Sequence, residues 1–101
     1  MILMMTASWP SESQQEVASR NQEIASKLPV PDFITMRGPY WYTSEGIQHA
    51  FIIYETDRSK IIDAYDYLVT FQRMYVGIPG FKREIKLCYE LADAEKTNPP
   101  T

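Results

Sequence analysis

The stretch that decides the fold is Ile47-Gln48-His49-Ala50-Phe51-Ile52-Ile53-Tyr54-Glu55. It is rich in β-branched and aromatic residues, which favours a β-strand. Apolar side chains occupy both alternating phases, with Phe51 and Ile53 in one and Ile52 and Tyr54 in the other. A strand that is apolar on both faces is expected in mid-sheet, with cover on each side. The chain's own helices can cover one face, so the other face needs a different cover.

The size and composition of the chain limit the class of protein to which it can belong. One domain fits 101 residues, and 45% hydrophobic content with a formal charge of -3 indicates an ordinary globular chain. This small negative net charge does not indicate a basic surface that would bind nucleic acid or an anionic membrane. The one cysteine, Cys88, excludes an internal disulfide and a multi-cysteine zinc site.

The amino-terminal residues indicate no targeting segment. The apolar run from Met1 to Met5 is too short for the core of a signal peptide and is not preceded by a basic residue. Elsewhere the chain has no stretch near the roughly 18 apolar residues that a membrane span requires. We therefore expect a cytoplasmic protein that does not enter the membrane.

Residue patterns predict four strands and two helices. The expected strands span residues 2–8, 33–42, 47–55 and 81–91, and the expected helices span about 12–27 and 56–76. Ser13 and Glu16 have the spacing of a capping box at the start of the first helix, and Thr56 or Asp57 is expected to cap the second. Gly38-Pro39 interrupts the second strand, which predicts an edge position or a bulge.

The βαββαβ order predicts a ferredoxin-like α+β fold over residues 1–92, with a polar tail at 93–101. Right-handed crossovers place both helices on one face of a four-stranded antiparallel sheet. Strands one and three are expected at the centre, since both are apolar on two faces. The uncovered face would then be partly apolar, so we expect two copies to pair through it as a homodimer.

The segment Val76-Gly77-Ile78-Pro79-Gly80-Phe81 ends the second helix and leads into the last strand. Together with the element order, it resembles the "vPGF" motif of the dimeric α+β barrel superfamily, in which two ferredoxin-like subunits pair their sheets. That superfamily includes cofactor-independent monooxygenases, muconolactone isomerase-like proteins, haem-dependent members and amino-acid-sensing modules. The resemblance therefore implies a fold and a dimer but no particular reaction and no subfamily.

His49 is the only histidine and the candidate catalytic residue. It would act as a general base or orient a ligand, either between sheet and helices or inside the barrel. The alternative is a hydrogen-bonded histidine near the start of a strand. No His/Glu pair has metal-ligand spacing, so we expect no metal site, and haem or another cofactor is not expected either.

The segment Arg37-Gly38-Pro39-Tyr40-Trp41-Tyr42 supplies further candidates for ligand binding. Arg37 could hold an anion such as a carboxylate, while Tyr40 and Trp41 could line a pocket. The alternative is that these aromatic residues are core and dimer contacts. Tyr54 in the third strand and Trp9 at the end of the first strand could complete the same pocket.

Two hypotheses of different class remain open. In the first, each subunit of the homodimer binds a small aromatic or amphipathic molecule, with cofactor-independent oxidation or isomerisation as its chemistry. His49, Arg37, Tyr40 and Tyr54 would make the polar contacts, and Trp9 and Trp41 would form apolar walls. In the second, the protein is a non-catalytic module for ligand sensing or assembly. A cavity with His49 or Arg37 directed inward would favour the first hypothesis.

Overall fold

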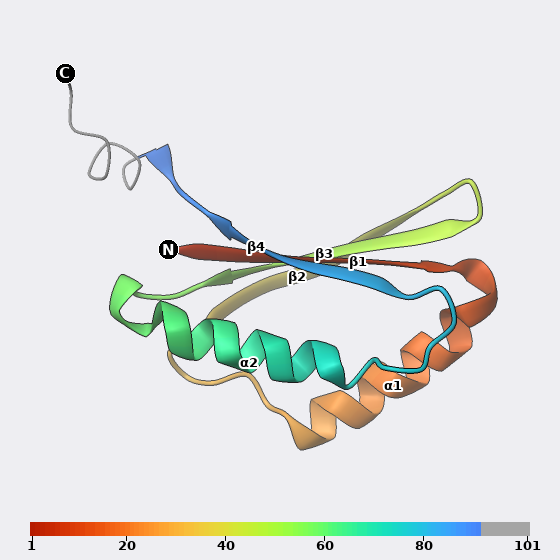
Figure 1. Cartoon of the computed structure of the whole chain (residues 1–101), viewed down its shortest axis with the longest axis horizontal. Coiled ribbons are helices and arrows are strands. Elements are labelled where there is room, and N and C mark those ends of the chain that lie inside the picture. Colours follow the sequence, from red (N-terminus) through yellow and green to blue (C-terminus); the bar gives the residue numbers. More distant parts are fainter. Residues whose placement is uncertain (92–101) are drawn as a thin grey trace.

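A computed structural model describes residues 1–91 as a four-stranded antiparallel sheet with two helices on one side (Figure 1). The elements are β1 (Ile2–Pro10), a 3-10 turn (Ser11–Ser13), α1 (Gln14–Lys27), β2 (Thr35–Ser44), β3 (Ile47–Glu55), a 3-10 turn (Arg58–Lys60), α2 (Ile61–Arg73) and β4 (Lys82–Cys88). The predicted βαββαβ order is confirmed. The strand order β2-β3-β1-β4 places the two doubly apolar strands at the centre, as predicted. The predicted tail at 93–101 lies outside the described residues.

The core fills the space between the sheet and the two helices. One cluster joins the middle of the sheet to α2 through Leu3, Met5, Ile34, Ile52, Tyr54, Ala64 and Leu68. A second cluster joins the end of β1 to α1 and to the segment before β4 through Trp9, Val17, Ile24, Tyr75 and Ile78. Burial of these large side chains supplies the main stabilisation of the fold.

β2 is an edge strand with an irregularity at Gly38-Pro39, as predicted. Its pairing with β3 passes from Arg37 opposite Ile53 to Tyr40 opposite Phe51, so Gly38-Pro39 lies across from a single residue of β3. A bulge of this kind re-aims the side chains that follow it. Tyr40 and Tyr42 consequently lie on one sheet face, while Trp41 lies on the other.

The predicted helix caps are wrong. Ser13 makes no capping bond; its hydroxyl instead donates to the Pro79 carbonyl oxygen at 2.8 Å. Thr56 donates to the Phe33 carbonyl oxygen at 2.9 Å, and Asp57 makes no side-chain cap either. A 3-10 turn precedes the regular part of each helix. The hydroxyl groups of Ser13 and Thr56 bind loops that are distant in the sequence instead of capping the helices.

The boundaries of three strands also differ from the prediction. β1 continues through Trp9 and Pro10, which pair with Gln48 and Ile47 of β3. β2 runs two residues later than predicted, and β4 ends at Cys88. The segment before β4 contains two glycines with positive φ, Gly77 at 92° and Gly80 at 71°. A Cβ on Gly80 would lie 2.6 Å from Pro10 Cγ, so this segment passes very close to the end of β1.

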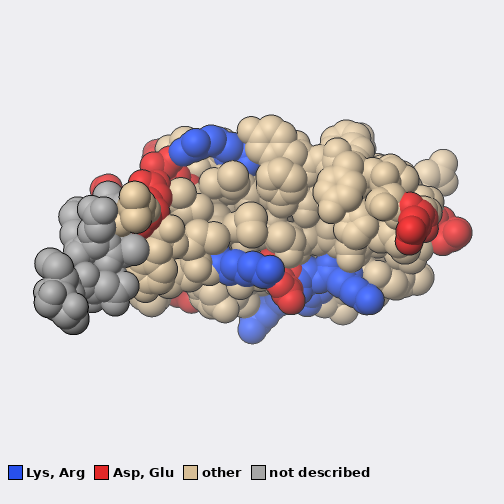
Figure 2. All heavy atoms as spheres, turned by 90° about the horizontal axis from the view of Figure 1, so that it is seen from above, with Lys and Arg blue, Asp and Glu red and all other residues tan. Residues whose placement is uncertain are grey.

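The outer face of the sheet, which the helices do not cover, carries a mixed set of side chains. Its apolar and aromatic members are Ile2, Met4, Tyr40, Tyr42, Phe51 and Ile53. Figure 2 looks onto this face and shows an uncharged middle with basic and acidic side chains mainly toward its borders. The edge strand β4 contributes Lys82, Glu84 and Lys86 to it.

Candidate functional site

A row of four side chains crosses the helix-facing side of the sheet, one from each strand: Trp41, Ala50, Ala7 and Arg83. The two central members are alanines, whereas Met5 and Trp9 occupy the neighbouring positions on the same face of β1. Because two methyl groups stand where larger side chains would otherwise lie in mid-sheet, a space is left between the sheet and the helices at this point. We call this row the alanine trough.

Above the alanine trough lies a cleft of about 480 Å³ between the sheet and the two helices. Helix α1 contributes small side chains to it as well, at Ala18 and Ala25. Its walls are aromatic and comprise Trp9, Trp41, Tyr54, Phe71, Tyr75 and Phe81. The volume lies in the range of roughly 300–1,000 Å³ that is usual for small-molecule sites.

One wall of the cleft is a stack of three aromatic rings. The Trp9 and Phe81 ring centroids are 5.8 Å apart, and those of Phe81 and Tyr75 are 4.8 Å apart and nearly parallel. Trp9 Nε1 donates to Gln14 Oε1 at 2.8 Å, and the Tyr75 hydroxyl donates to Asn21 Oδ1. Both polar ends of the stack are therefore held by α1, which fixes the wall in place.

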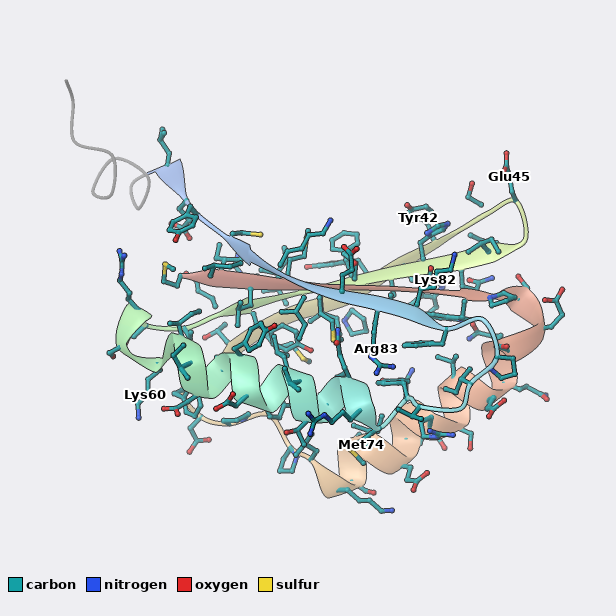
Figure 3. The ribbon with its side chains drawn as sticks, in the orientation of Figure 1. Tyr42, Glu45, Lys60, Met74, Lys82 and Arg83 are labelled. Atoms are coloured by element: carbon teal, nitrogen blue, oxygen red, sulfur yellow. The ribbon has the colours of Figure 1, made fainter. Side chains whose placement is uncertain are left out.

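Two polar side chains line the cleft without a side-chain hydrogen bond to the described residues: Arg83, which is exposed at its rim, and Gln72, whose amide nitrogen is buried. Arg83 extends from β4 toward the helices, whereas its neighbour Lys82 lies on the other side of the sheet (Figure 3). Within residues 1–91, Arg83 forms no ion pair. Gln72 Nε2 of α2 is buried without a hydrogen-bond partner in that same part of the chain.

The tyrosines that line the cleft remain neutral phenols at physiological pH. Burial raises the pKa of Tyr75 to about 12 and raises the pKa of Tyr54 further still. Burial also raises the pKa of Tyr67, which lines the cleft beside them. No carboxylate, imidazole or thiol of the described chain lines the cleft. Its lining is therefore suited to binding more than to proton transfer near neutral pH.

His49 lies in a separate hollow, on the outer face of the sheet. This hollow measures about 360 Å³ and is lined in part by Thr6, Ser8, Phe51, Lys82 and Glu84. The imidazole stacks on Tyr42, with ring centroids 4.9 Å apart and an interplanar angle of 13°. Unlike the cleft, this hollow contains groups of both charge signs at neutral pH.

The six residues predicted to form one site fall on opposite faces of the sheet. Trp9, Trp41 and Tyr54 line the cleft. His49 lies in the outer hollow, Tyr40 packs against Phe51 with ring centroids 5.3 Å apart, and Arg37 forms an ion pair with Glu55. The alternation of a strand explains the split, since His49 and Tyr54 are an odd number of residues apart on β3 and must point oppositely.

Sequence reasoning missed Ala7, Ala50, Arg83 and Gln72 as residues of the site. A signal for Arg83 was present, because this charged residue lies in the apolar phase of the last strand, between Phe81 and Ile85. The alanines were visible as small residues in the apolar phases of β1 and β3. That they face each other depends on strand register, which no local pattern specifies.

Metal-binding clusters and membrane-spanning helices are both absent from residues 1–91. This part of the chain contains no group of three or more His, Cys, Asp or Glu side chains placed to hold a metal ion. None of its helices is long and apolar enough to span a membrane.

Comparison with known proteins identifies the fold of this chain but no family. Neither a protein-family model nor a curated protein matches the sequence. Among solved structures, a dimeric ferredoxin-like protein from an uncultured marine organism is 13% identical with a TM-score of 0.55, over 89% of this chain and 94% of that chain. Rv0793 from Mycobacterium tuberculosis is 13% identical with a TM-score of 0.51, over 91% and 99%.

A designed protein has the same architecture. The de novo protein Foldit4 is 9% identical to this chain with a TM-score of 0.54, and the match covers 88% of this chain and 96% of the design. At such low identities these likenesses establish the ferredoxin-like α+β fold alone. Because a designed protein shares it, the fold by itself carries no function, and the site must supply the argument.

Proposed function

We propose that the protein is a homodimer in which each subunit binds a small aromatic or amphipathic organic molecule in the cleft above the alanine trough. The observation that carries this proposal is the pairing of Ala7 with Ala50 in the floor of the cleft. Small side chains there leave a cleft of about 480 Å³ with aromatic walls, which Ala18 and Ala25 of α1 also line. Interiors are normally close-packed, so a cleft of this size between sheet and helix is a binding feature.

Binding without catalysis is the better-supported role of the cleft. A general base works best when its pKa lies near the operating pH. The titratable groups lining the cleft are Arg83 and tyrosines, and burial moves the pKa of Tyr54 and Tyr75 away from neutrality. A sensing or carrier role is therefore favoured for this cleft.

The outer sheet face supports pairing with a second copy. It exposes apolar and aromatic side chains that include Tyr40 and Tyr42, which are 49% and 55% exposed, with Met4, Phe51 and Ile53 beside them. Patches of this kind usually mark an interface. A structural neighbour is described as a dimeric ferredoxin-like protein, which supports the same assembly here.

The His49 hollow is a second candidate site, for cofactor-independent oxidation or isomerisation. What favours it is the imidazole beside Ser8, Lys82 and Glu84, a mixed polar set of the kind that proton transfer needs. In a face-to-face dimer the partner would close this hollow, so such chemistry would take place inside the barrel. From β2, Tyr42 lines it, and Arg37 and Tyr40 lie on the same sheet face.

Intrinsic fluorescence tests the cleft directly, because both tryptophans of the chain line it. A panel of small aromatic and amphipathic compounds is titrated into the intact protein while tryptophan emission is followed. We expect saturable changes for some members, and their loss in Ala50→Leu, which fills the trough. His49→Gln, on the opposite face, is the control and retains them. Absence of saturable binding across the panel would refute the proposed function.

A further inference from the structure

The geometry of the cleft points to a flat aromatic carboxylate as its ligand, with Arg83 and Gln72 donating to the carboxylate. This inference rests on the proposed function, because it names the class of ligand for the same cleft. It draws on three independent features of the cleft: its shape, its charge and an unused buried donor.

The shape of the cleft favours a planar molecule. Ala7 and Ala50 form its floor. Its walls include the stacked rings of Trp9, Phe81 and Tyr75, against which a flat ligand can pack. Across the sheet the cleft is long, because its two ends, Trp41 and Arg83, arise from strands three interstrand spacings apart, about 14 Å. A fused two-ring system fits between them.

The charge of the cleft favours a single negative group at one end. Arg83 is the one cationic side chain among its described lining residues, and no acidic side chain lines the cleft there. A guanidinium presents a fork of donors that matches a carboxylate with two parallel hydrogen bonds. With Arg83 at the β4 side and Trp41 at the β2 side, the carboxylate would lie toward β4 and the rings toward β2.

Gln72 supplies an additional donor. A buried amide nitrogen without a partner carries a desolvation cost, so natural proteins rarely retain one without a reason. Gln72 Nε2 has no partner within the described chain, and the side chain lines the cleft. Rotation of this side chain toward a bound carboxylate would satisfy both the amide and a ligand oxygen.

The test compares an acid with its neutral isostere. 2-Naphthoate and 2-naphthamide have the same rings and nearly the same size, and calorimetric titration measures both affinities for the intact protein. We expect wild type to prefer the acid by about tenfold or more, the usual strength of a charged hydrogen-bonded pair. Arg83→Gln should remove most of this preference, because it lowers the affinity for the acid much more than the affinity for 2-naphthamide.

Lys82→Gln is the matched control, because it removes the same charge from the adjacent residue on the other sheet face. It should keep the preference for the acid. Equal affinities of wild type for acid and amide, both lost in Ala50→Leu, would overturn the carboxylate inference and leave the proposed function standing. Failure of wild type to bind either compound would overturn both for this ligand class.

Gln72→Leu separates a ligand contact from a purely structural role. Leucine keeps the approximate size and removes the buried unpaired amide, so the free protein should unfold at the same or a higher temperature. The affinity for 2-naphthoate should fall by several-fold, on the order of one hydrogen bond to a charged group. An unchanged preference for the acid in this variant would remove Gln72 from the inference.

Discussion

Ala7 and Ala50 are direct partners in the β1–β3 ladder, and both face the helices between the larger side chains of Met5 and Trp9. Each residue alone is an ordinary small strand residue. Their registration across two central strands creates the low floor of the cleft, with Trp41 and Arg83 at its two ends. The site therefore originates in a pairing of two residues that lie far apart in the sequence.

Ala50→Val should stabilise the free protein by about 1 kcal/mol, because valine favours strands and its added methyl groups enter open space. The urea midpoint of unfolding measures this. Ala64→Val is the comparison, because Ala64 of α2 is 0% exposed and packs in the core against the sheet. Overpacking there should cost about 1–3 kcal/mol. Destabilisation of similar size in both variants would mean that the space above Ala50 is already filled.

Ile53→Lys should break the proposed dimer into monomers, because Ile53 lies in the middle of the outer face and pairs with Met4. Light scattering behind a sizing column should give twice the 11.7 kDa chain mass for wild type and one chain mass for the variant. Ile62→Lys is the control, since Ile62 is 71% exposed on α2, away from that face. A monomeric wild type at micromolar concentration would contradict the pairing.

His49→Ala should leave ligand affinity in the cleft unchanged, because His49 lies in the hollow on the opposite face. The dissociation constant from tryptophan fluorescence is the measurement. Loss of affinity in this variant would move the binding site to the outer hollow. Loss of turnover with unchanged affinity would instead assign chemistry to His49 and support the second candidate site.

Stability should fall as the pH rises above 10. Burial raises the pKa of Tyr75 to about 12 and also raises the pKa values of Tyr54 and Tyr67. The unfolded chain then loses protons near the ordinary value of 10.0 while the folded chain retains them, so unfolding is favoured. Between about pH 10 and 12, Tyr54 and Tyr75 each remove up to about 1.4 kcal/mol per pH unit.

Absorbance at the tyrosinate band gives an independent check of the same prediction. Of the seven tyrosines, those with raised pKa values should ionise late or only on unfolding. Tyr75→Phe should remove one late step and reduce the loss of stability above pH 10. Ionisation of all seven near the ordinary value in the folded protein would contradict the burial of these rings.

Gly80→Ala should destabilise the protein by about 2–4 kcal/mol, since it combines strain at positive φ with a steric clash. The new methyl group would approach Pro10 Cγ to 2.6 Å. Gly46→Ala isolates the conformational part, because Gly46 also has positive φ but a Cβ added there would have no atom within 4 Å. Equal unfolding free energies for the two variants would show that the close approach is relieved without cost.

The fold could be predicted because its determinants are local and repeat along the chain. The double apolarity of residues 47–55 placed that strand at the centre, and the Gly38-Pro39 interruption placed β2 at an edge. The capping predictions were wrong because a polar residue before a helix has several acceptors within reach. Ser13 donates to Pro79, 66 residues away, rather than to its own helix.

By itself, the sequence determined the order of the elements, the central and edge strands, and a sheet face that the helices leave uncovered. Periodicity and turn residues specify these features within short windows. Only the tertiary structure decided that Trp41, Ala50, Ala7 and Arg83 form one row, and that His49 and Arg37 lie on the face opposite Trp9 and Tyr54. The physical reason is that register and bulge position set which distant side chains meet, and a shift of one residue would exchange the two faces.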